Sequence, residues 1–297
     1  MAVRADFAPE LHDERDLVFT PSNPAAARTL TAEEVDHYNT SGFLSPLPLF
    51  DDDETDRIRA YVDDLLARVV GAPDRRNAYS INSYHLVCRG LYDLILTPRL
   101  LDYVEDIVGP DIVSWGQHLF CKLPGDPMAV PLHQDAIYWP LAPARSVTAW
   151  LAIDDADEEN AAMQLVPGSH RLGAVPHVEK PLDGTRVLKR QVAEPTRFPE
   201  RFNDSLRAGE ISLHSDLLLH GSPANPSDRR RAGLTIRFAA ASVRPLPGWE
   251  WFAIPTVHCR GSIPPHWPQW PRPPGEDPEK LADVWGDFDG TPMPDAG

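Results

Sequence analysis

The feature that most restricts the fold of this chain is a change in its hydrophobic pattern near residue 111. Before that point apolar residues recur at helical spacing, and after it short extended segments are separated by Gly, Pro and Asp. The expected strands lie at residues 112–122, around His133, and at 147–153, 163–166, 210–213, 217–220 and 232–239. Many short strands without helices between them predict a β-sandwich or a jelly roll, and argue against a sheet of alternating strands and helices.

Three helices are expected before the strands. The first opens with a capping box, in which the Thr31 hydroxyl and the Glu34 carboxylate each accept a hydrogen bond from the other residue's backbone amide. The others lie between residues 53 and 71 and between residues 97 and 109, where an acidic run or a proline favours the start and a glycine the end. Each has an apolar face, so we expect it to pack against the sheets. A last short helix is expected at residues 278–285.

The 297 residues are interpreted as a single domain, because they contain no internal repeat and no low-complexity linker. Residues 1–27 are charged, aperiodic and interrupted by prolines, and we expect them to form a loosely ordered lead-in. Residues 244–297 form an extension rich in proline and tryptophan. The sequence leaves the role of this extension open between a lid, a dimer contact and core packing.

Composition argues against several classes of partner. The chain has 44 acidic and 28 basic side chains and a formal net charge of −16, which disfavours binding to nucleic acids or to anionic membranes. No apolar stretch approaches the ~20 residues of a membrane span, and the first residues do not have the pattern of a signal peptide. We therefore expect a soluble, cytoplasmic protein. The sequence does not predict its oligomeric state.

A candidate metal site begins at His133-Gln-Asp135. Side chains two positions apart on an extended strand point to the same face, so this imidazole and this carboxylate can bind one ion. A second histidine from another strand would complete the 2-His-1-carboxylate triad that suits Fe(II) with open coordination positions. The chain contains a rival pair with the same spacing, His214 and Asp216.

Distances along the chain favour the first pair. His220 ends an expected strand, and Arg231 follows eleven residues later, which leaves room for a turn and a return on a neighbouring strand. A guanidinium binds a carboxylate with two parallel hydrogen bonds, so Arg231 could hold a carboxylate cosubstrate. A shift of one residue in register would give this role to Arg230. For the rival pair the next histidine after His220 is His258, in a segment with poor strand character.

Five segments, in order, resemble the phytanoyl-CoA dioxygenase (PhyH) family of Fe(II)/2-oxoglutarate-dependent oxygenases. They are the expected helix 97–109 with the strand after it, Leu132-His-Gln-Asp-Ala-Ile-Tyr-Trp-Pro140, Gln164-Leu-Val-Pro-Gly-Ser-His170, Leu219-His-Gly-Ser222, and Arg231. The resemblance extends from about residue 30 to about residue 243. It implies a mainly β fold with flanking helices, whose core is a double-stranded β-helix (a cupin-like jelly roll).

The resemblance also implies roles for individual residues. His133, Asp135 and His220 match the family's iron ligands; Arg231 and Ser222 match residues that bind the far carboxylate of 2-oxoglutarate; Trp150 and His118 lie where the family has neighbours of the cosubstrate. Relatives that chlorinate carbon have a small residue in place of the carboxylate ligand. The presence of Asp135 therefore indicates oxidation without halide.

One part of the family pattern is missing. The family often has a basic residue on an early strand, but residues 79–85 contain neither lysine nor arginine, which leaves His85 as the candidate replacement. Polar and aromatic side chains in residues 79–85, and others directly after the His133–Asp135 segment, are the candidates for the substrate pocket. They are Tyr79, Asn82, Tyr84, His85, Tyr138 and Trp139.

The resemblance implies an oxidoreductase that uses Fe(II), O₂ and 2-oxoglutarate. The triad leaves three coordination positions, two for 2-oxoglutarate and one for O₂. We expect hydroxylation of an unactivated C–H bond in a small molecule, with a natural-product intermediate as the favoured class. Alternatives with the same cofactors are desaturation, cyclisation or epimerisation, or hydroxylation of an amino acid, a phosphonate or an acyl-CoA. From a different functional class, the protein could be a non-catalytic metal-binding jelly roll.

Overall fold

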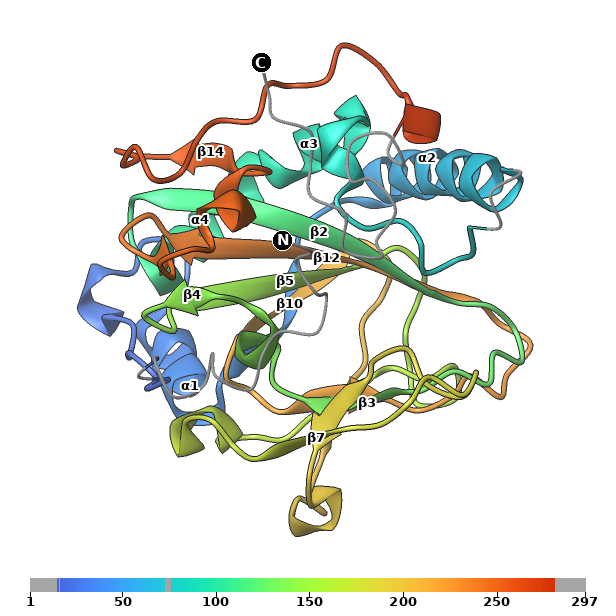
Figure 1. Ribbon diagram of the computed structural model, residues 1–297, viewed down its shortest axis with the longest axis horizontal. Helices are drawn as coiled ribbons and strands as arrows, with labels where there is room; N and C mark the ends of the chain where they lie inside the picture. The colour runs from blue at the N-terminus through green and yellow to red at the C-terminus, as the bar shows by residue number, and fades with distance from the viewer. Residues whose placement is uncertain (1–14, 16, 73–75, 281–297) are drawn as a thin grey trace.

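Two antiparallel sheets dominate the computed structural model of the protein, which describes residues 15, 17–72 and 76–280 (Figure 1). Their strands are β1 (Phe43–Pro48), β2 (Ile112–Lys122), β3 (Val130–His133), β5 (Ser146–Ala152), β6 (Met163–Leu165), β9 (Phe202–Asp204), β10 (Glu210–Ser215), β11 (His220–Ser222), β12 (Arg231–Ala240) and β14 (Val257–Arg260). The larger sheet has the order β1-β10-β5-β12-β2-β14, and the smaller one β3-β11-β6-β9. This arrangement confirms the predicted mainly β jelly roll.

Two further strand pairs and four α-helices surround these sheets. The pairs are β4 (Leu141–Ala142) with β13 (Arg244–Pro245), and β7 (His177–Glu179) with β8 (Arg190–Val192). The helices are α1 (Ala32–Ser41), α2 (Asp52–Val70), α3 (Arg89–Ile95) and α4 (Pro98–Val108). In Figure 1, α2 and α3 lie on one side of the larger sheet, and the smaller sheet with β3 lies on the other. Helices therefore cover the outer face of the larger sheet.

Alternation along the strands of the larger sheet divides their residues between these two sides. On β12, Leu234 and Ile236 belong to the apolar core shared with the helices. Thr235 and Arg237 of the same strand line a cavity between the two sheets, and Trp150 on β5 faces the same cavity. One face of the larger sheet thus stabilises the fold, while the other is available to a ligand.

The structure confirms the signals for the first two helices and for the longest strand. The Thr31 hydroxyl accepts a hydrogen bond from the Glu34 amide at the start of α1, and the Glu34 carboxylate accepts one in return. A second capping box, between Asp51 and Glu54, uses the acidic run ahead of α2. The predicted strand Ile112–Lys122 has the bounds of β2.

The predicted strand at residues 217–220 is wrong. Residues 216 and 217 form a turn, in which the Leu218 amide donates to the Ser215 carbonyl at 2.9 Å, and β11 begins only at His220. The three leucines before His220 are buried, and a short apolar run of this kind is compatible with any buried conformation. Burial was therefore predicted correctly, and extended structure was not.

Helix α3 was not predicted. It has only seven residues and no side-chain cap at Cys88, so it carries no sequence signal of a start, and the packing of buried residues such as Leu91 and Ile95 stabilises it. At the other end of the chain, the expected helix 278–285 is described only as a 3-10 turn at Pro278–Lys280. Its remaining residues lie outside the described part of the chain.

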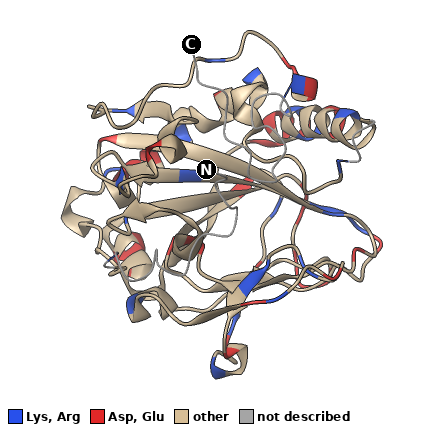
Figure 2. Ribbon diagram, viewed as in Figure 1, with Lys and Arg blue, Asp and Glu red and all other residues tan. Residues whose placement is uncertain are grey.

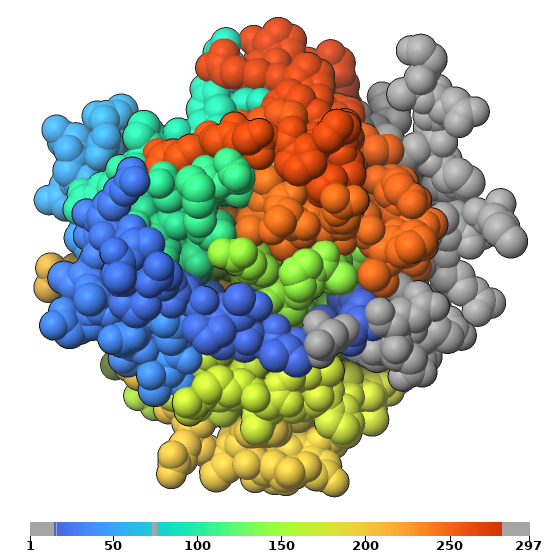
Figure 3. Space-filling view, turned by 90° about the vertical axis from the view of Figure 1, so that its left-hand side faces the viewer, coloured from blue at the N-terminus to red at the C-terminus, as the bar shows by residue number. Residues whose placement is uncertain are grey.

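The described residues of the expected lead-in pack against the rest of the protein. Leu17 is buried, and the ring of Phe19 contacts that of His170 at a centroid distance of 4.3 Å. In Figure 3 this blue segment crosses the face between residues near β4 (green) and residues near 170 (yellow-green). Residues 1–14 and 16 lie outside the described residues.

The C-terminal extension contributes to the core and to the larger sheet. Strand β14 pairs with β2, at the edge of that sheet. Trp267 is almost fully buried, and its indole Nε1 donates to the carbonyl oxygens of Ala241 (3.1 Å) and Val243 (2.9 Å). Core packing is therefore one role of this segment.

Charged side chains lie mainly on the helices and loops, and the strands of the larger sheet carry few (Figure 2). Strand β5 has no charged residue, and the only ones on β12 are Arg231 and Arg237. A charge inside a sheet is costly unless a partner or a ligand compensates it, so these two arginines require an explanation. Among the described helices, none is long and apolar enough to cross a membrane.

Candidate functional site

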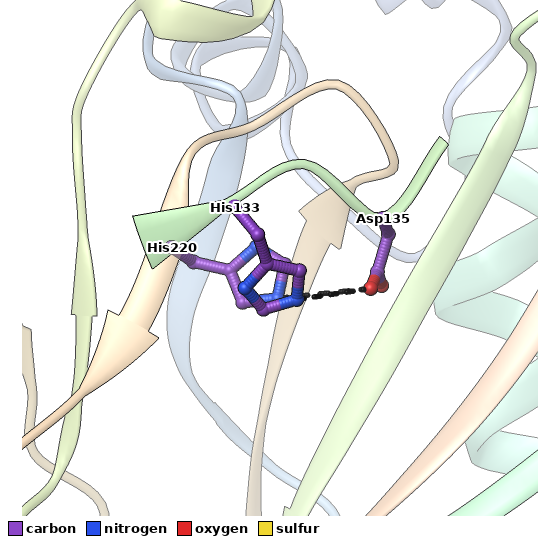
Figure 4. Close-up of side chains that lie close together, drawn as sticks. All are labelled: His133, Asp135 and His220. Carbon is purple, nitrogen blue, oxygen red and sulfur yellow. Dashed lines mark ion pairs between the residues drawn. The ribbon is translucent and has the colours of Figure 1, made fainter. Parts of the chain in front are cut away.

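Three side chains from two adjacent strands and the following turn meet between the sheets (Figure 4). His133 is the last residue of β3 and His220 the first of β11, and the two are direct partners in the antiparallel register. Their rings lie 4.3 Å apart between centroids, as expected for cross-strand neighbours on one face. The sequence predicts Asp135 on the same strand as His133. In the structure Asp135 instead begins a 3-10 helix (Asp135–Tyr138). Because Gln134 is still extended, the carboxylate keeps the same side as His133.

The distances among these groups are those of a metal-binding cluster. Oδ1 of Asp135 lies 3.5 Å from Nε2 of His133 and 3.9 Å from Nε2 of His220. One ligand atom from each residue lies within 4.8 Å of the others, and all three residues are buried. Within residues 15, 17–72 and 76–280 no second group of three histidine, cysteine or acidic side chains has this geometry.

Hydrogen bonds fix the orientation of both imidazoles. Nδ1 of His133 lies 2.9 Å from the Pro131 carbonyl, and Nδ1 of His220 lies 3.0 Å from the Leu218 carbonyl. A carbonyl can only accept, so each Nδ1 carries the proton and each Nε2 has a free lone pair. This is the arrangement found around metal-binding histidines. The residues present therefore fit a divalent metal with nitrogen and oxygen ligands.

The electrostatics of the cluster also suit a metal. Burial opposes ionisation of Asp135, but the adjacent imidazoles of His133, His214 and His220 hold its pKa well below the usual range. Burial, together with repulsion from neighbouring imidazoles, lowers the pKa of His220 well below its usual value. A charged carboxylate and a neutral imidazole are the protonation states in which these groups bind metals.

Two further side chains contact the second oxygen of the carboxylate. The Thr148 hydroxyl donates to Oδ2 of Asp135 at 3.1 Å, and Nε2 of His214 lies 3.9 Å from the same oxygen. His214 is 1% exposed, and neither of its ring nitrogens has a hydrogen-bond partner. The rival pair, His214 and Asp216, therefore does not form a second metal site of its own. His214 lines the cavity, whereas Asp216 does not and has Arg15 as an electrostatic partner.

Arg231, the first residue of β12, occupies the other end of the cavity. Its Nη2 donates to Oγ of Ser222 at 3.3 Å, its Nε has no partner, and its guanidinium lies 5.5 Å from the ring centre of Trp150. Burial lowers the pKa of Arg231 to about 10, so the side chain remains charged at neutral pH. A buried cation with an unused donor is suited to bind a carboxylate.

The neighbouring arginines point away from the cavity. Arg230 pairs with Asp154 (2.7 Å) and Asp63 (2.5 Å), and Arg229 pairs with Asp157 (2.8 Å). The register question left open by the sequence is therefore answered by geometry, since of these three arginines only Arg231 lines the cavity.

The cavity is enclosed by both sheets and includes most of the residues predicted for the metal and the cosubstrate. Its lining residues are Phe120, Val130, His133, Asp135, Trp150, Met163, His214, His220, Gly221, Ser222, Arg231, Thr235 and Arg237. His118 does not belong to this lining. Its Nε2 lies 2.8 Å from the Tyr79 carbonyl, and burial lowers its pKa to about 4.

Among the predicted substrate residues, Tyr84 and His85 are placed elsewhere. The segment turns into a 3-10 helix (Tyr84–Leu86) instead of continuing as a strand. Tyr84 is buried in the apolar core, where its hydroxyl accepts a hydrogen bond from Arg76 at 2.6 Å. Nε2 of His85 lies 2.9 Å from the Pro255 carbonyl. Neither side chain lines the cavity, so His85 does not replace the missing basic residue there.

The other predicted substrate residues lie around the cavity without lining it. Tyr79 donates its hydroxyl to Asp126 at 2.6 Å, and Asn82 forms an isolated backbone bridge with His118. The half-buried Tyr138 packs its ring 5.8 Å from that of His133 and donates to the Arg190 carbonyl at 2.9 Å. The buried Trp139 packs edge-to-face on Trp115.

Sequence reasoning missed Thr148, Thr235 and Arg237. A signal was available, because residues two apart on a strand share a face. Counting by two from Arg231 reaches Thr235 and Arg237, and counting back by two from Trp150 reaches Thr148.

Comparison with known proteins identifies the family. The model of the phytanoyl-CoA dioxygenase (PhyH) family matches residues 38–233, about two thirds of the chain. The chain belongs to this family. The predicted enzyme class, an Fe(II)/2-oxoglutarate-dependent dioxygenase, and its predicted cofactors are thereby confirmed.

Individual PhyH relatives are distant. The peroxisomal phytanoyl-CoA dioxygenase of Bos taurus is 29% identical over 157 residues, which are 51% of this chain and 47% of the bovine protein. The match thus spans about half the length of that relative. Among solved structures, the non-heme monooxygenase ThoJ in its apo form is 25% identical with a TM-score of 0.71, covering 86% of this chain and 94% of ThoJ.

A second solved structure supports the fold alone. The non-heme alpha ketoglutarate dependent carbocyclase SnoK from nogalamycin biosynthesis is 22% identical to this chain. Its TM-score is 0.60, and the match covers 77% of this chain and 90% of SnoK.

Proposed function

We propose that this PhyH protein hydroxylates an unactivated C–H bond of a small-molecule natural-product intermediate. His133, Asp135 and His220 would hold Fe(II), which with O₂ and 2-oxoglutarate supplies the oxidising power of the reaction. Each would use the atom left free by its hydrogen bonds: Nε2 of the two histidines and Oδ1 of the carboxylate.

The remaining residues of the cavity would bind and orient 2-oxoglutarate. Arg231 would hold its far carboxylate with the unused donors of the guanidinium, assisted by the Ser222 hydroxyl. The indole of Trp150 stacks beside this guanidinium and would exclude water from the ion pair. Thr148 would keep the Asp135 carboxylate oriented toward the ion.

The observation that carries this proposal is the presence of the triad and of Arg231 in one cavity between the two sheets. A metal-binding module without turnover would not need a buried arginine with a free donor facing the same space. The retained Asp135 favours oxygenation without halide, since the carboxylate would occupy the position that a halide needs.

The test is a panel of small molecules incubated with the protein, Fe(II), 2-oxoglutarate and O₂. We expect succinate formation to rise with a subset of compounds, and the product of each to gain one oxygen atom by mass. A product that has lost two hydrogens would indicate desaturation, and a product of unchanged mass would indicate epimerisation. If 2-oxoglutarate is never converted to succinate, the proposed function is wrong and the metal-binding module becomes the better interpretation.

A further inference from the structure

A second arginine, Arg237, lies in the same cavity. It is on the cavity face of β12 and lies six residues beyond Arg231. Within the described residues Asp135 acts on this guanidinium through its charge, without a hydrogen bond or a close ion pair between the two, and Nε of Arg237 is buried without a hydrogen-bond partner. The rest of the side chain keeps some accessible surface, which lies in the cavity.

Two tryptophans hold this guanidinium in place. Its carbon lies 5.4 Å from the ring centre of Trp115 and 5.6 Å from that of Trp139. The two indoles pack edge-to-face with centroids 4.5 Å apart. Contact with two aromatic faces stabilises the cation, yet neither ring offers the conventional hydrogen-bond acceptor that the N–H groups require. The side chain is therefore oriented while its donors stay free.

The strand register places Arg237 at the metal end of the cavity. Arg237 is the β-partner of Thr148, whose hydroxyl contacts Asp135, while Arg231 is the partner of Lys122 at the opposite end of β12. Six residues of strand span roughly 20 Å. A cosubstrate that reaches from Arg231 to the metal would therefore leave Arg237, at the other end of this stretch of β12, available to a second ligand.

The charge balance of the cavity lining leaves one positive charge in excess. Its charged lining residues are Asp135, Arg231 and Arg237. Under the proposed function, Fe(II) and the two carboxylates of 2-oxoglutarate cancel each other, and Asp135 offsets one of the two arginine charges. One positive charge remains inside the fold, where an unpaired ion is costly, so a ligand with one negative charge would neutralise the loaded site.

From these observations we propose that the substrate carries a carboxylate, or an anionic group of similar shape, which Arg237 binds beside the metal. This inference rests on the proposed function, because it takes the other cavity arginine as the cosubstrate site. Arg237 then determines specificity, since an uncharged analogue would leave the guanidinium buried and unpaired.

Matched acids and amides test this proposal directly. The full-length protein is loaded with Fe(II) and 2-oxoglutarate without O₂, and binding of each straight-chain carboxylate from butyrate to decanoate is compared with binding of its carboxamide. Fluorescence of the tryptophans beside Arg237 reports binding without any turnover. We expect at least one acid to bind ten or more times tighter than its amide.

Variants assign any such preference to Arg237. Arg237→Gln should reduce the acid-to-amide ratio to near one, and Arg237→Lys should retain part of it, because a point charge replaces the two-pronged donor. Arg272→Gln is the matched control, since this exposed arginine pairs with Asp93 far from the cavity. If Arg237→Gln does not fold, as judged by circular dichroism, the lysine variant decides.

Two results would overturn the proposal: no acid preferred over its amide by the wild type, or a preference that both Arg237 variants keep. Failure of the proposed function has a different signature. In that case the wild type would show no visible absorption band with Fe(II) and 2-oxoglutarate, whatever the outcome with the acids.

Discussion

At the scale of single residues, the site depends on contacts that hold the ligands in place. The Asp135 carboxylate offers one oxygen to the metal position, while Thr148 contacts the other. Partners behind a metal ligand typically change metal affinity by about 10–100-fold when removed. The role of Thr148 can be tested because valine has nearly the same shape without the hydroxyl.

We expect Thr148→Val to weaken binding of Fe(II) or Co(II) by about 10–100-fold, because the carboxylate loses its orienting donor. Thr148→Ser keeps the hydroxyl and should bind metal nearly as well as the wild type. Isothermal titration calorimetry without O₂ measures both affinities. Equal affinities for the valine and serine variants would show that the hydroxyl does not orient Asp135.

The two neighbouring arginines provide a second test at this scale. Arg231→Gln should weaken 2-oxoglutarate binding by at least about 30-fold, because losing one partner of a buried charge pair costs 2–5 kcal/mol. Arg230→Gln removes a charge next to it in sequence but outside the cavity, and should leave this affinity unchanged. Equilibrium binding of 2-oxoglutarate to the metal-loaded protein distinguishes the two positions. A larger loss with Arg230→Gln would mean that the register is shifted.

At the scale of elements, strand β12 positions both arginines and leaves room for Trp150. A Cβ at Gly233 would lie 2.0 Å from the Trp150 ring. Glycine is therefore required here, because the Trp150 side chain of β5 lies against the backbone of β12 at this position. Trp150 in turn lies beside Arg231. A single methyl group on β12 should therefore affect both the fold and the cosubstrate end of the cavity.

Gly233→Ala should destabilise the protein by about 1–3 kcal/mol through overpacking, and should also weaken 2-oxoglutarate binding as the indole is displaced. Urea unfolding and the binding assay above measure the two effects. Gly275→Ala is the control, because no atom lies within 4 Å of its added Cβ. Tight 2-oxoglutarate binding by a destabilised Gly233→Ala protein would show that Trp150 does not support the cosubstrate site.

The elements also show which features a sequence can predict. Capping boxes and strand alternation are local, so α1, α2 and β2 and the shared face of His133 and Asp135 could be predicted. The same alternation places Arg237 on the face of Arg231, although only Arg231 was predicted as a site residue. Helix α3 and the burial of Tyr84 depend on packing between segments that are distant in sequence, so no local sequence pattern predicts them. The unpartnered nitrogens of His214 are a tertiary feature of the same kind.

At the scale of the whole molecule, one buried carboxylate should contribute to the pH dependence of stability. Asp216, in the turn after β10, is 3% exposed, and burial together with the charge of Asp135 raises its pKa from 3.8 to about 7. The folded protein thus holds a proton that the unfolded chain has lost between these pH values. The contribution of Asp216 to stability is present below pH 3.8 and is lost as the pH rises through 7.

Asp216→Asn removes this ionisation. The variant should gain free energy of unfolding relative to the wild type at pH 8, by up to roughly 4 kcal/mol, and much less at pH 4.5. Urea unfolding of both proteins at the two pH values measures the difference. An equal gain at both pH values would contradict the raised pKa.

The central claim is that one cavity holds iron through His133, Asp135 and His220 and 2-oxoglutarate through Arg231. Absorption spectroscopy without O₂ tests it most directly, because Fe(II) chelated by 2-oxoglutarate in such a site gives a weak visible charge-transfer band. We predict that the wild-type protein shows the band when both are added and that His133→Ala abolishes it. A wild-type protein without the band, or a His133→Ala protein that retains it, would contradict the claim.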